Sequence, residues 1–258
     1  IQKDSGDYAY QSTFEYKENE QWPGHLYKYK LNSDGSIGNK LWDAAEKLKN
    51  IKPASRNIWT AGLNVSGTNN FTTTYRNELK GSLFPNSAPS DTEVDDLINF
   101  IRGVDTYDED ADNNKTEERH KLNDIYNSEL MIVGSVNGTT ASDGLTNFQK
   151  KDAYYRSVNK YDEFKNGTSC GGKCSERKEV VYAGSNGGML HAFDASDGSN
   201  GGDELWAYIP PNLLGKLSGM ISSTANQTNS IYGVDGSVVV KDIYYDDTPT
   251  NNKDDPSW

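Results

Sequence analysis

The sequence predicts an all-β protein, a β-propeller interrupted by short helical insertions, and three observations carry this prediction. In the segment 180–211, short β-branched and aromatic runs alternate with turns rich in Gly and Asp. An internal repeat relates the segments 24–42 and 188–206. The composition, with 34% hydrophobic residues, 24 glycines and 16 tyrosines, suits many short strands joined by polar loops. Such strands are typical of propeller blades, which bury their faces against neighbouring blades.

The segment 180–211 is expected to form a β-hairpin and the start of a third strand. Strands are predicted over 180–182, 189–193 and 204–209 because these runs are β-branched or aromatic. The intervening GSNGG, 184–188, supplies residues that tolerate positive φ, so the chain can reverse tightly there.

The internal repeat predicts that the same unit occurs more than once. Each copy begins with Gly, continues as an alternating strand, passes an Asp-Gly turn and ends in Leu-Trp, with the same spacing from Gly to Trp. Further strands are expected at 231–245, a third partial copy with its hairpin turn at Asp235-Gly236, and at 56–62 and 130–138. The chain therefore reads as several imperfect blades.

Helices are predicted in two places. The segment 43–48 has a short helix-like pattern. The segment 91–103 is a stronger helix, with Ser90 or Asp91 as its cap, an apolar stripe on one face and Gly103 as its end. We expect insertions that decorate the blades at about 64–129 and 142–178, so that 1–258 forms one part of a single propeller domain.

The charge balance narrows the range of partners. The formal net charge is −12, from 26 basic and 38 acidic residues. This balance argues against nucleic acid or an anionic membrane as a partner and is compatible with divalent cations. The sequence has no apolar run long enough to cross a bilayer. Its first residues, IQKDSGDYAY, do not resemble a signal peptide, so a secreted protein would be represented here by an excised domain.

The acidic run 105–118 is the best candidate site. Oxygen-bearing side chains alternate along it, as they do at positions 1, 3, 5 and 7 of an EF-hand-like calcium loop. Two residues depart from that pattern: Asn113 stands where Gly is usual, and Arg119 stands where a bidentate Glu is expected. The alternative is a solvated acidic loop. The predicted calcium ligands are Asp108, Asp110, Asp112, Asn114 and Glu117.

The two cysteines, Cys170 and Cys174, lie close together in SCGGKCS. A zinc site needs about four ligands, and the histidines are distant in sequence. We therefore expect a small disulfide loop, which implies an oxidising compartment, with two free thiols as the alternative.

No residue is predicted to be catalytic. The chain contains no nucleophile elbow, phosphate-binding loop or zinc-binding helix motif. Its three histidines are His25, His120 and His191. His25 and His191 lie one and three residues after the first glycine of their repeat copies, and a place near the start of the repeat strand favours a packing or turn role. The sequence therefore predicts a protein that is not an enzyme.

Eight segments, taken in order, resemble the C-terminal propeller domain of the PilC/PilY family of type IV pilus tip-associated adhesins and biogenesis factors. They are WPGHLYKYKL, LWDAAEKL, RNIWTAG, LINFIRGVD, LNDIYNSELMIVG, VVYAGSNGGMLHAFDASDG, LWAYIPPNLL and YGVDGSVVVKDIYY, spread from Trp22 to Tyr245. The block NGGMLHAFDA followed by AYIP is the most specific of them.

This resemblance implies a modified seven-bladed propeller with quinoprotein-like blades, of which the chain is roughly the first half. It implies an extracellular place, at the pilus tip or on the outer-membrane surface of a Gram-negative bacterium. The implied partners are the pilus fibre and minor pilins, a host cell surface or matrix, and the remainder of the propeller. The implied work is support of pilus extension against retraction and attachment to host cells. Calcium is the implied cofactor, because adhesins of this family bind it through EF-like loops.

Two other functions remain open from the sequence. A quinone-dependent dehydrogenase would use similar blades, with an Asp base and a calcium ion on the propeller axis; Asp194 and Asp242 are turn or strand-end residues and are not assigned that role. An envelope scaffold without adhesion would use the same blades. Quinone absorbance would identify the first, and cell-binding assays would separate the second from an adhesin.

Overall fold

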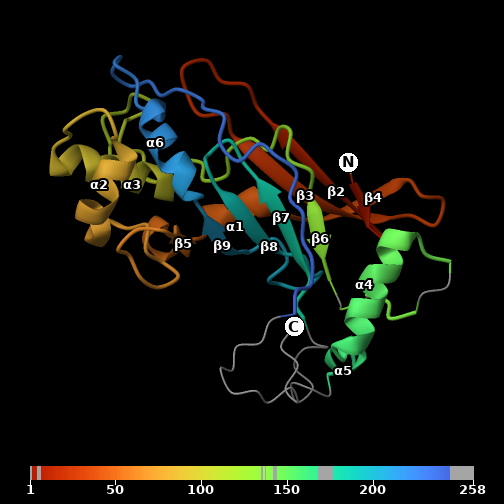
Figure 1. Cartoon of the computed structure of the whole chain (residues 1–258). Helices are drawn as coiled ribbons and strands as arrows, with labels where there is room; N and C mark the ends of the chain where they lie inside the picture. Colours follow the sequence, from red (N-terminus) through yellow and green to blue (C-terminus); the bar gives the residue numbers. More distant parts are fainter. Residues whose placement is uncertain are drawn as a thin grey trace. The chain divides into compact units, whose positions relative to one another are not determined.

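A computed structural model describes the backbone of residues 2–4 and the residues 7–134, 136, 138–141, 144–167 and 177–244. The chain divides into two compact units. Unit 1 comprises 1–132 and 180–238, and unit 2 comprises 133–179 and 239–258. Figure 1 shows the helices and strands with the labels used below.

The first sheet of unit 1 is an antiparallel meander in the order β1-β2-β3-β4. Its strands are β1 (Gln2–Asp4), β2 (Tyr8–Phe14), β3 (Gly24–Leu31) and β4 (Ile37–Asp43). The β3–β4 turn contains the predicted Asp-Gly pair, and Gly35 has a φ of 80°. Helix α1 (Ala44–Lys49) follows at once, and the side chain of Asp43 caps it by accepting a hydrogen bond from Ala45 N.

The second sheet has the order β5-β9-β8-β7-β6. Its strands are β5 (Ile58–Trp59), β6 (Met131–Val133), β7 (Val180–Gly184), β8 (Leu190–Asp194) and β9 (Glu204–Tyr208). Strands β7, β8 and β9 form an antiparallel meander, whereas β5 lies parallel to β9. The three strands predicted within 180–211 are therefore confirmed. Gly188, in the β7–β8 turn, adopts a φ of 84°, which glycine reaches without a steric cost.

A layer of helices packs against the second sheet and builds the first core cluster of unit 1. It contains α2 (Arg76–Leu83), α3 (Asp91–Arg102) and α6 (Leu214–Leu217), with short 3₁₀ turns at Pro53–Ser55, Thr73–Tyr75, Pro211–Leu213 and Ser218–Met220. Leu97 and Ile98 of α3 are fully buried and share this cluster with Ala207 of β9. Figure 1 shows α2, α3 and α6 side by side.

The two sheets share the second core cluster. Tyr10 and Leu26 from the first sheet are fully buried against Val181 and Phe193 from the second. Trp42 adds a hydrogen bond across this core, from its Nε1 to the carbonyl of Ser196 at 3.0 Å. Each sheet therefore buries one face against the other.

Helix α3 begins and ends as the sequence predicts. Ser90 and Glu93 form a capping box, in which each side chain binds the other residue's backbone N–H, and Gly103 ends the helix with a φ of 115°. We expect Ser90→Ala to lower the free energy of unfolding by about 1 kcal/mol, because the backbone N–H of Glu93 loses its side-chain acceptor. Chemical denaturation measures this loss. Ser87→Ala, an exposed position just before the cap, is the matched control. Equal stabilities of the two variants would contradict the role of the cap.

The prediction of an all-β propeller is wrong for the described part of the chain. Its strands lie in two open sheets, of four and five strands, and helices α1 to α6 accompany them. The segment 64–129, expected as an insertion, contains α2 and α3. The apolar stripe of α3 and the buried side chains of α2 pack on the second sheet, which removes them from water.

The predicted third hairpin at 231–245 is also wrong over its described residues, 231–244, which form no strand. The β7–β8 turn binds this segment instead. Val234 N donates to the carbonyl of Ser185 at 3.0 Å, and Gly233 N donates to Asn186 Oδ1 at 3.1 Å. The carboxylate of Asp235 accepts hydrogen bonds from Asn127. These contacts use donors and acceptors that a hairpin would have paired.

Unit 2 contains α4 (Asn147–Val158) and α5 (Tyr161–Lys165), so part of the predicted insertion 142–178 is helical. Tyr161 is its buried centre and donates to Asp242 Oδ2 at 2.6 Å, while Arg177 pairs with the other oxygen of Asp242. Burial and this hydrogen bond raise the pKa of Tyr161 to about 12.

Cys170 and Cys174 lie outside the described residues, and their disulfide stays a prediction.

Among the described residues, no helix combines the length and the apolar character that a bilayer crossing requires.

Candidate metal centre

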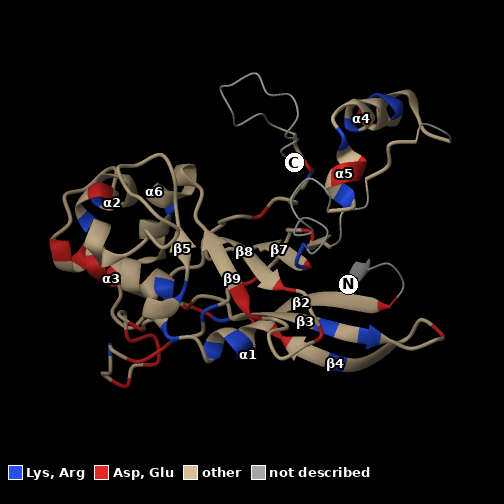
Figure 2. Ribbon diagram, turned by 90° about the horizontal axis from the view of Figure 1, so that it is seen from below, with Lys and Arg blue, Asp and Glu red and all other residues tan. Residues whose placement is uncertain are grey.

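The acidic loop follows α3 and is closed at its base by an antiparallel bridge between Val104 and Glu118. Asp105 N donates to the carbonyl of Glu117 at 2.9 Å, and Arg119 N donates to the carbonyl of Gly103 at 3.0 Å. In Figure 2, acidic residues gather along this loop, next to the end of α3. The bridge holds the two ends of the run together, so its carboxylates share a small volume.

Left-handed residues bend the loop tightly. Asp108, Ala111 and Asn113 have φ values of 57°, 60° and 69°. Asn113 therefore adopts the conformation for which an EF-hand-like loop uses Gly, and Asn is among the residues that tolerate it. Backbone donors then orient the carboxylates, with Asn113 N 2.9 Å from Asp108 Oδ1 and Asn114 N 2.7 Å from Asp112 Oδ1.

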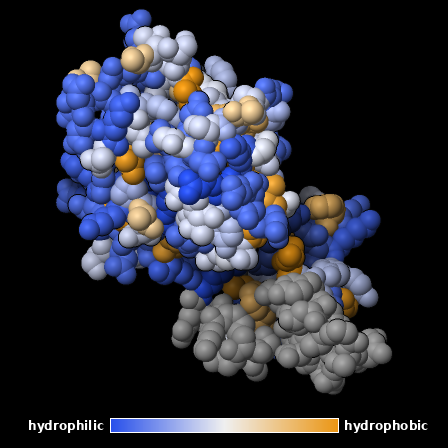
Figure 3. Space-filling model, turned by 90° about the vertical axis from the view of Figure 1, so that its left-hand side faces the viewer, coloured by the Kyte–Doolittle hydropathy of each residue, from blue (hydrophilic) through white to orange (hydrophobic). Residues whose placement is uncertain are grey.

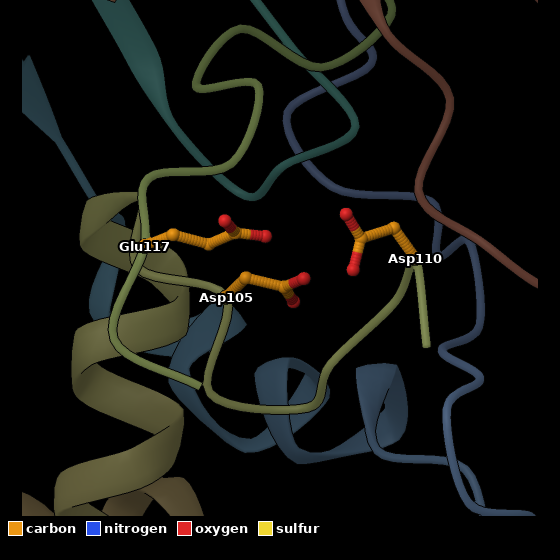
Figure 4. Close-up of side chains that lie close together, drawn as sticks. All are labelled: Asp105, Asp110 and Glu117. Carbon is orange, nitrogen blue, oxygen red and sulfur yellow. The ribbon is translucent and has the colours of Figure 1, made fainter. Parts of the chain in front are cut away.

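The loop brings carboxylates together in two overlapping groups, each with ligand oxygens within 4.8 Å of one another. One group is Asp105, Asp110 and Glu117, whose carboxylates point toward a common space in Figure 4. The other is Asp108, Asp110 and Asp112. Two oxygens bound to the same Ca²⁺ lie at most about 5 Å apart, because each lies roughly 2.3–2.6 Å from the ion. Either group therefore fits a hard divalent cation, and Asp110 belongs to both.

The predicted ligands are divided between these two carboxylate groups. Asp108, Asp110 and Asp112 lie together as expected, whereas Glu117 joins Asp105 and Asp110. Asn114 lies in neither carboxylate group: its Oδ1 accepts a hydrogen bond from Thr116 Oγ1 at 2.8 Å, and its Nδ2 donates to Glu117 at 3.3 Å.

Asp105 is the residue that the sequence pattern missed. It is 4% exposed, and its carboxylate accepts hydrogen bonds from Glu109 N at 2.9 and 3.1 Å. It lies outside the alternating run, and only the bridge at the base of the loop brings it opposite Glu117. The sequence signal for Asp105 is its position directly after the helix-ending Gly103-Val104, where the acidic run begins.

The electrostatics of the loop favour a cation. Burial raises the pKa of Asp105, and the charges of Glu109 and Asp110 raise it further, against the opposing effect of the Glu109 N–H and Arg119. Desolvation raises the pKa of Glu117, and the neighbouring carboxylates of Asp112 and Asp110 add to this rise. Both shifts mean that the ionised carboxylates of Asp105 and Glu117 are destabilised by their surroundings. A bound cation would stabilise these ionised forms.

Arg119 does not contribute a ligand. Its Nε donates to Glu109 Oε2 at 2.8 Å, and its guanidinium lies 4.1 Å from the centre of the Phe100 ring. The residue that departs from the EF-hand pattern therefore anchors the loop to α3.

A second cluster of titratable groups lies in the core. Ser185 Oγ lies 3.0 Å from His191 Nε2, and His191 Nδ1 lies 2.8 Å from Glu204 Oε1. This is the order of groups in a Ser-His-carboxylate nucleophile. However, Ser185 and His191 are 0% exposed, and Arg56 binds both oxygens of Glu204. The cluster is therefore shielded from solvent in this structure.

The pKa shifts agree with a structural network. Burial lowers the pKa of His191 and keeps it neutral. Burial alone would raise the pKa of Glu204, but Arg56 and His191 hold it below its usual range. His191 also stacks on Phe193, with ring centres 5.4 Å apart, as His25 stacks on Tyr27 at 5.5 Å. His191 is fully buried, whereas the side chain of His25 is 29% exposed, so the two histidines differ in environment and their expected packing or turn role stays a prediction.

Comparison with known proteins identifies the relatives of this chain. No family profile and no solved structure matches it. It is 30% identical over 249 residues to the type IV pilus biogenesis factor PilY1 of Pseudomonas aeruginosa strain UCBPP-PA14, an alignment that covers 93% of this chain and 19% of the relative. It is 28% identical over 270 residues to a PilY1 homolog of Xylella fastidiosa strain Temecula1, covering 92% of this chain and 17% of the relative.

These relatives define a class, the type IV pilus biogenesis factors. The chain spans about a fifth of their length. It belongs to the PilC/PilY family, as its ordered sequence motifs predict.

Proposed function

We propose that this chain is part of a type IV pilus biogenesis factor that acts outside the cell, at the pilus tip or on the outer-membrane surface. The observation that carries this proposal is the alignment of 93% of the chain with PilY1. Contact with the pilus fibre and its minor pilins, and attachment to a host surface or matrix, belong to the same proposal. The names of the relatives describe a biogenesis factor and not an enzyme.

Deletion of this domain from its parent protein tests the proposal. We expect surface pilin, sheared from the cells and measured by immunoblotting, to fall sharply while total pilin stays unchanged. Blocking pilus retraction should restore surface pili if the domain supports extension against retraction. Attachment of these restored pili to host cells, compared with pili that keep the domain, then tests adhesion separately. Normal piliation after the deletion would contradict the proposal.

We further propose that the acidic loop binds calcium. Its support is the donor set: carboxylate oxygens of the kind that Ca²⁺ prefers, within 4.8 Å of one another, with raised pKa values at Asp105 and Glu117. A bound ion would hold Asp105, Asp110 and Glu117 against their mutual repulsion and so order the loop.

The shared residue Asp110 gives the sharpest test of calcium binding. We expect Asp110→Ala to abolish the heat of calcium binding in calorimetry and the rise in thermal stability that calcium produces in the wild type, because both carboxylate groups lose a member. Glu78→Gln, an exposed acidic position on α2, is the matched control and should bind as the wild type does. Equal heats of calcium binding for the wild type and Asp110→Ala would contradict the proposal that this loop binds calcium.

A further inference from the structure

A pocket of about 660 Å³ in unit 1 lies next to the acidic loop and shares Glu118 with the run 105–118, but none of the carboxylates grouped in that loop lines it. Two histidines, His25 of β3 and His120, line it together with Glu20 and Glu46. The centres of the two imidazole rings are 5.5 Å apart, with 59° between their planes. The sequence places these histidines 95 positions apart, so only the fold brings them together.

The tautomer of His25 is set by Asp43. His25 Nδ1 lies 2.8 Å from Asp43 Oδ2, and the other oxygen of Asp43 accepts from Ala45 N at 2.9 Å. Because a carboxylate only accepts hydrogen bonds, Nδ1 carries the proton, and the neutral ring offers the lone pair of Nε2. Asp43 is 6% exposed, so its position is fixed by the core and by the helix that it caps.

The tautomer of His120 is set by a backbone carbonyl. His120 Nε2 lies 2.8 Å from the carbonyl oxygen of Gly24, which can only accept. Nε2 therefore carries the proton, and Nδ1 offers its lone pair. Burial lowers the pKa of His120, which favours the neutral ring near pH 7. Each histidine thus donates one ring N–H to an acidic or carbonyl oxygen, the arrangement found around metal-bound imidazoles.

The ring separation suits a shared ion. A transition-metal ion lies about 2.0–2.1 Å from a histidine nitrogen, which puts each ring centre roughly 3 Å from the ion and two bound rings roughly 5–6 Å apart. The pair His25 and His120 has that separation. The pocket leaves room for water. Among the described residues, no carboxylate forms a group with both histidines in which all ligand atoms lie within 4.8 Å of one another, so water takes the remaining positions.

His191 makes a similar contact with a carboxylate but lies in a closed environment. His191 has the same contact from Nδ1 to a carboxylate, that of Glu204, but its Nε2 is bound to Ser185 Oγ and the residue is fully buried. His25 has His120 and a pocket near its ring instead.

We propose that His25 Nε2 and His120 Nδ1 bind one divalent transition-metal ion of the Zn²⁺ type, with water completing its coordination. Imidazole nitrogen suits Zn²⁺, Cu²⁺ and Ni²⁺, whereas the acidic loop offers only oxygen, so the two sites differ in chemistry. The proposal does not depend on the pilus assignment. Asp43 and the Gly24 carbonyl act as positioning groups for the two ligands.

Calorimetric titration of the 258-residue chain with Zn²⁺, in excess Ca²⁺, tests the proposal. Cys170→Ser and Cys174→Ser are introduced first, because free thiols would bind zinc. We expect one ion per chain, and we expect His25→Gln and His120→Gln each to weaken binding roughly tenfold or more. Asp110→Asn, in the acidic loop, is the control and should leave zinc binding unchanged. Absence of binding, or unchanged affinity in both histidine variants, overturns the proposal.

A second measurement uses the cysteine-free parent with its histidines intact, so it does not depend on the folding of the histidine variants. The chain has three histidines, so their ring ¹⁵N signals can be assigned by NMR. We expect Zn²⁺ to shift the signals of His25 Nε2 and His120 Nδ1 and to leave those of His191 in place. A zinc-dependent shift confined to other residues, or none at all, also overturns the proposal.

Discussion

Replacement of Arg56 by alanine is expected to lower the free energy of unfolding by about 3–5 kcal/mol, enough to unfold a marginally stable domain. Arg56 is 1% exposed, and its guanidinium binds both carboxylate oxygens of Glu204, at 2.8 and 2.9 Å. It also donates to the carbonyl oxygens of Ile101 and Arg102 at the end of α3. Its loss would leave the buried Glu204 carboxylate without its charged partner, with only the contact to His191, and would remove a donor from two carbonyls.

The measurement is urea denaturation of Arg56→Ala beside Arg76→Ala. Arg76 also pairs with a carboxylate, that of Asp95, but its side chain is 37% exposed, so its replacement should cost less than about 1 kcal/mol. Similar losses of unfolding free energy in the two variants would show that burial does not determine how much the Arg56–Glu204 pair stabilises the fold. Far-ultraviolet circular dichroism reports whether Arg56→Ala remains folded before denaturant is added.

Replacement of Gly24 by alanine is expected to destabilise unit 1 by about 3 kcal/mol or more, because the added methyl group meets backbone. A Cβ at Gly24 would lie 2.3 Å from the carbonyl oxygen of Asn123 and 2.6 Å from its carbon. Gly24 N also donates to the carbonyl of Leu122 at 2.7 Å, so the two segments cannot separate without breaking a hydrogen bond.

Gly81→Ala is the matched control for Gly24→Ala. Gly81 lies in α2, where an added Cβ meets no atom within 4 Å, and alanine is the better helix former. We expect this variant to gain roughly 0.5–1 kcal/mol, so the same chemical change should have opposite signs at the two positions. Thermal unfolding of the two variants measures the difference. A loss of stability in both would contradict the argument from local space.

The acidic loop shows how far a sequence pattern can predict which side chains lie together. Alternating carboxylates identify Asp108, Asp110 and Asp112, because spacing within one loop is a local property. Asp105 could not be identified in this way, because its approach to Glu117 depends on the bridge between Val104 and Glu118. The pair His25 and His120 is a stronger case, since no local pattern relates the two residues.

The sequence by itself determined the local elements. Period-two alternation and glycine turns define the β7–β8–β9 meander, and a capping box with a terminal glycine defines α3, because these signals act between residues a few positions apart. Only the tertiary structure decided how these elements assemble. The apolar stripe of α3 covers the second sheet, and the β7–β8 turn binds the segment 231–244 that would otherwise suit a strand. Which apolar faces are buried together, and which backbone groups pair, depends on segments that are far apart in the sequence. A local sequence pattern therefore does not predict these contacts.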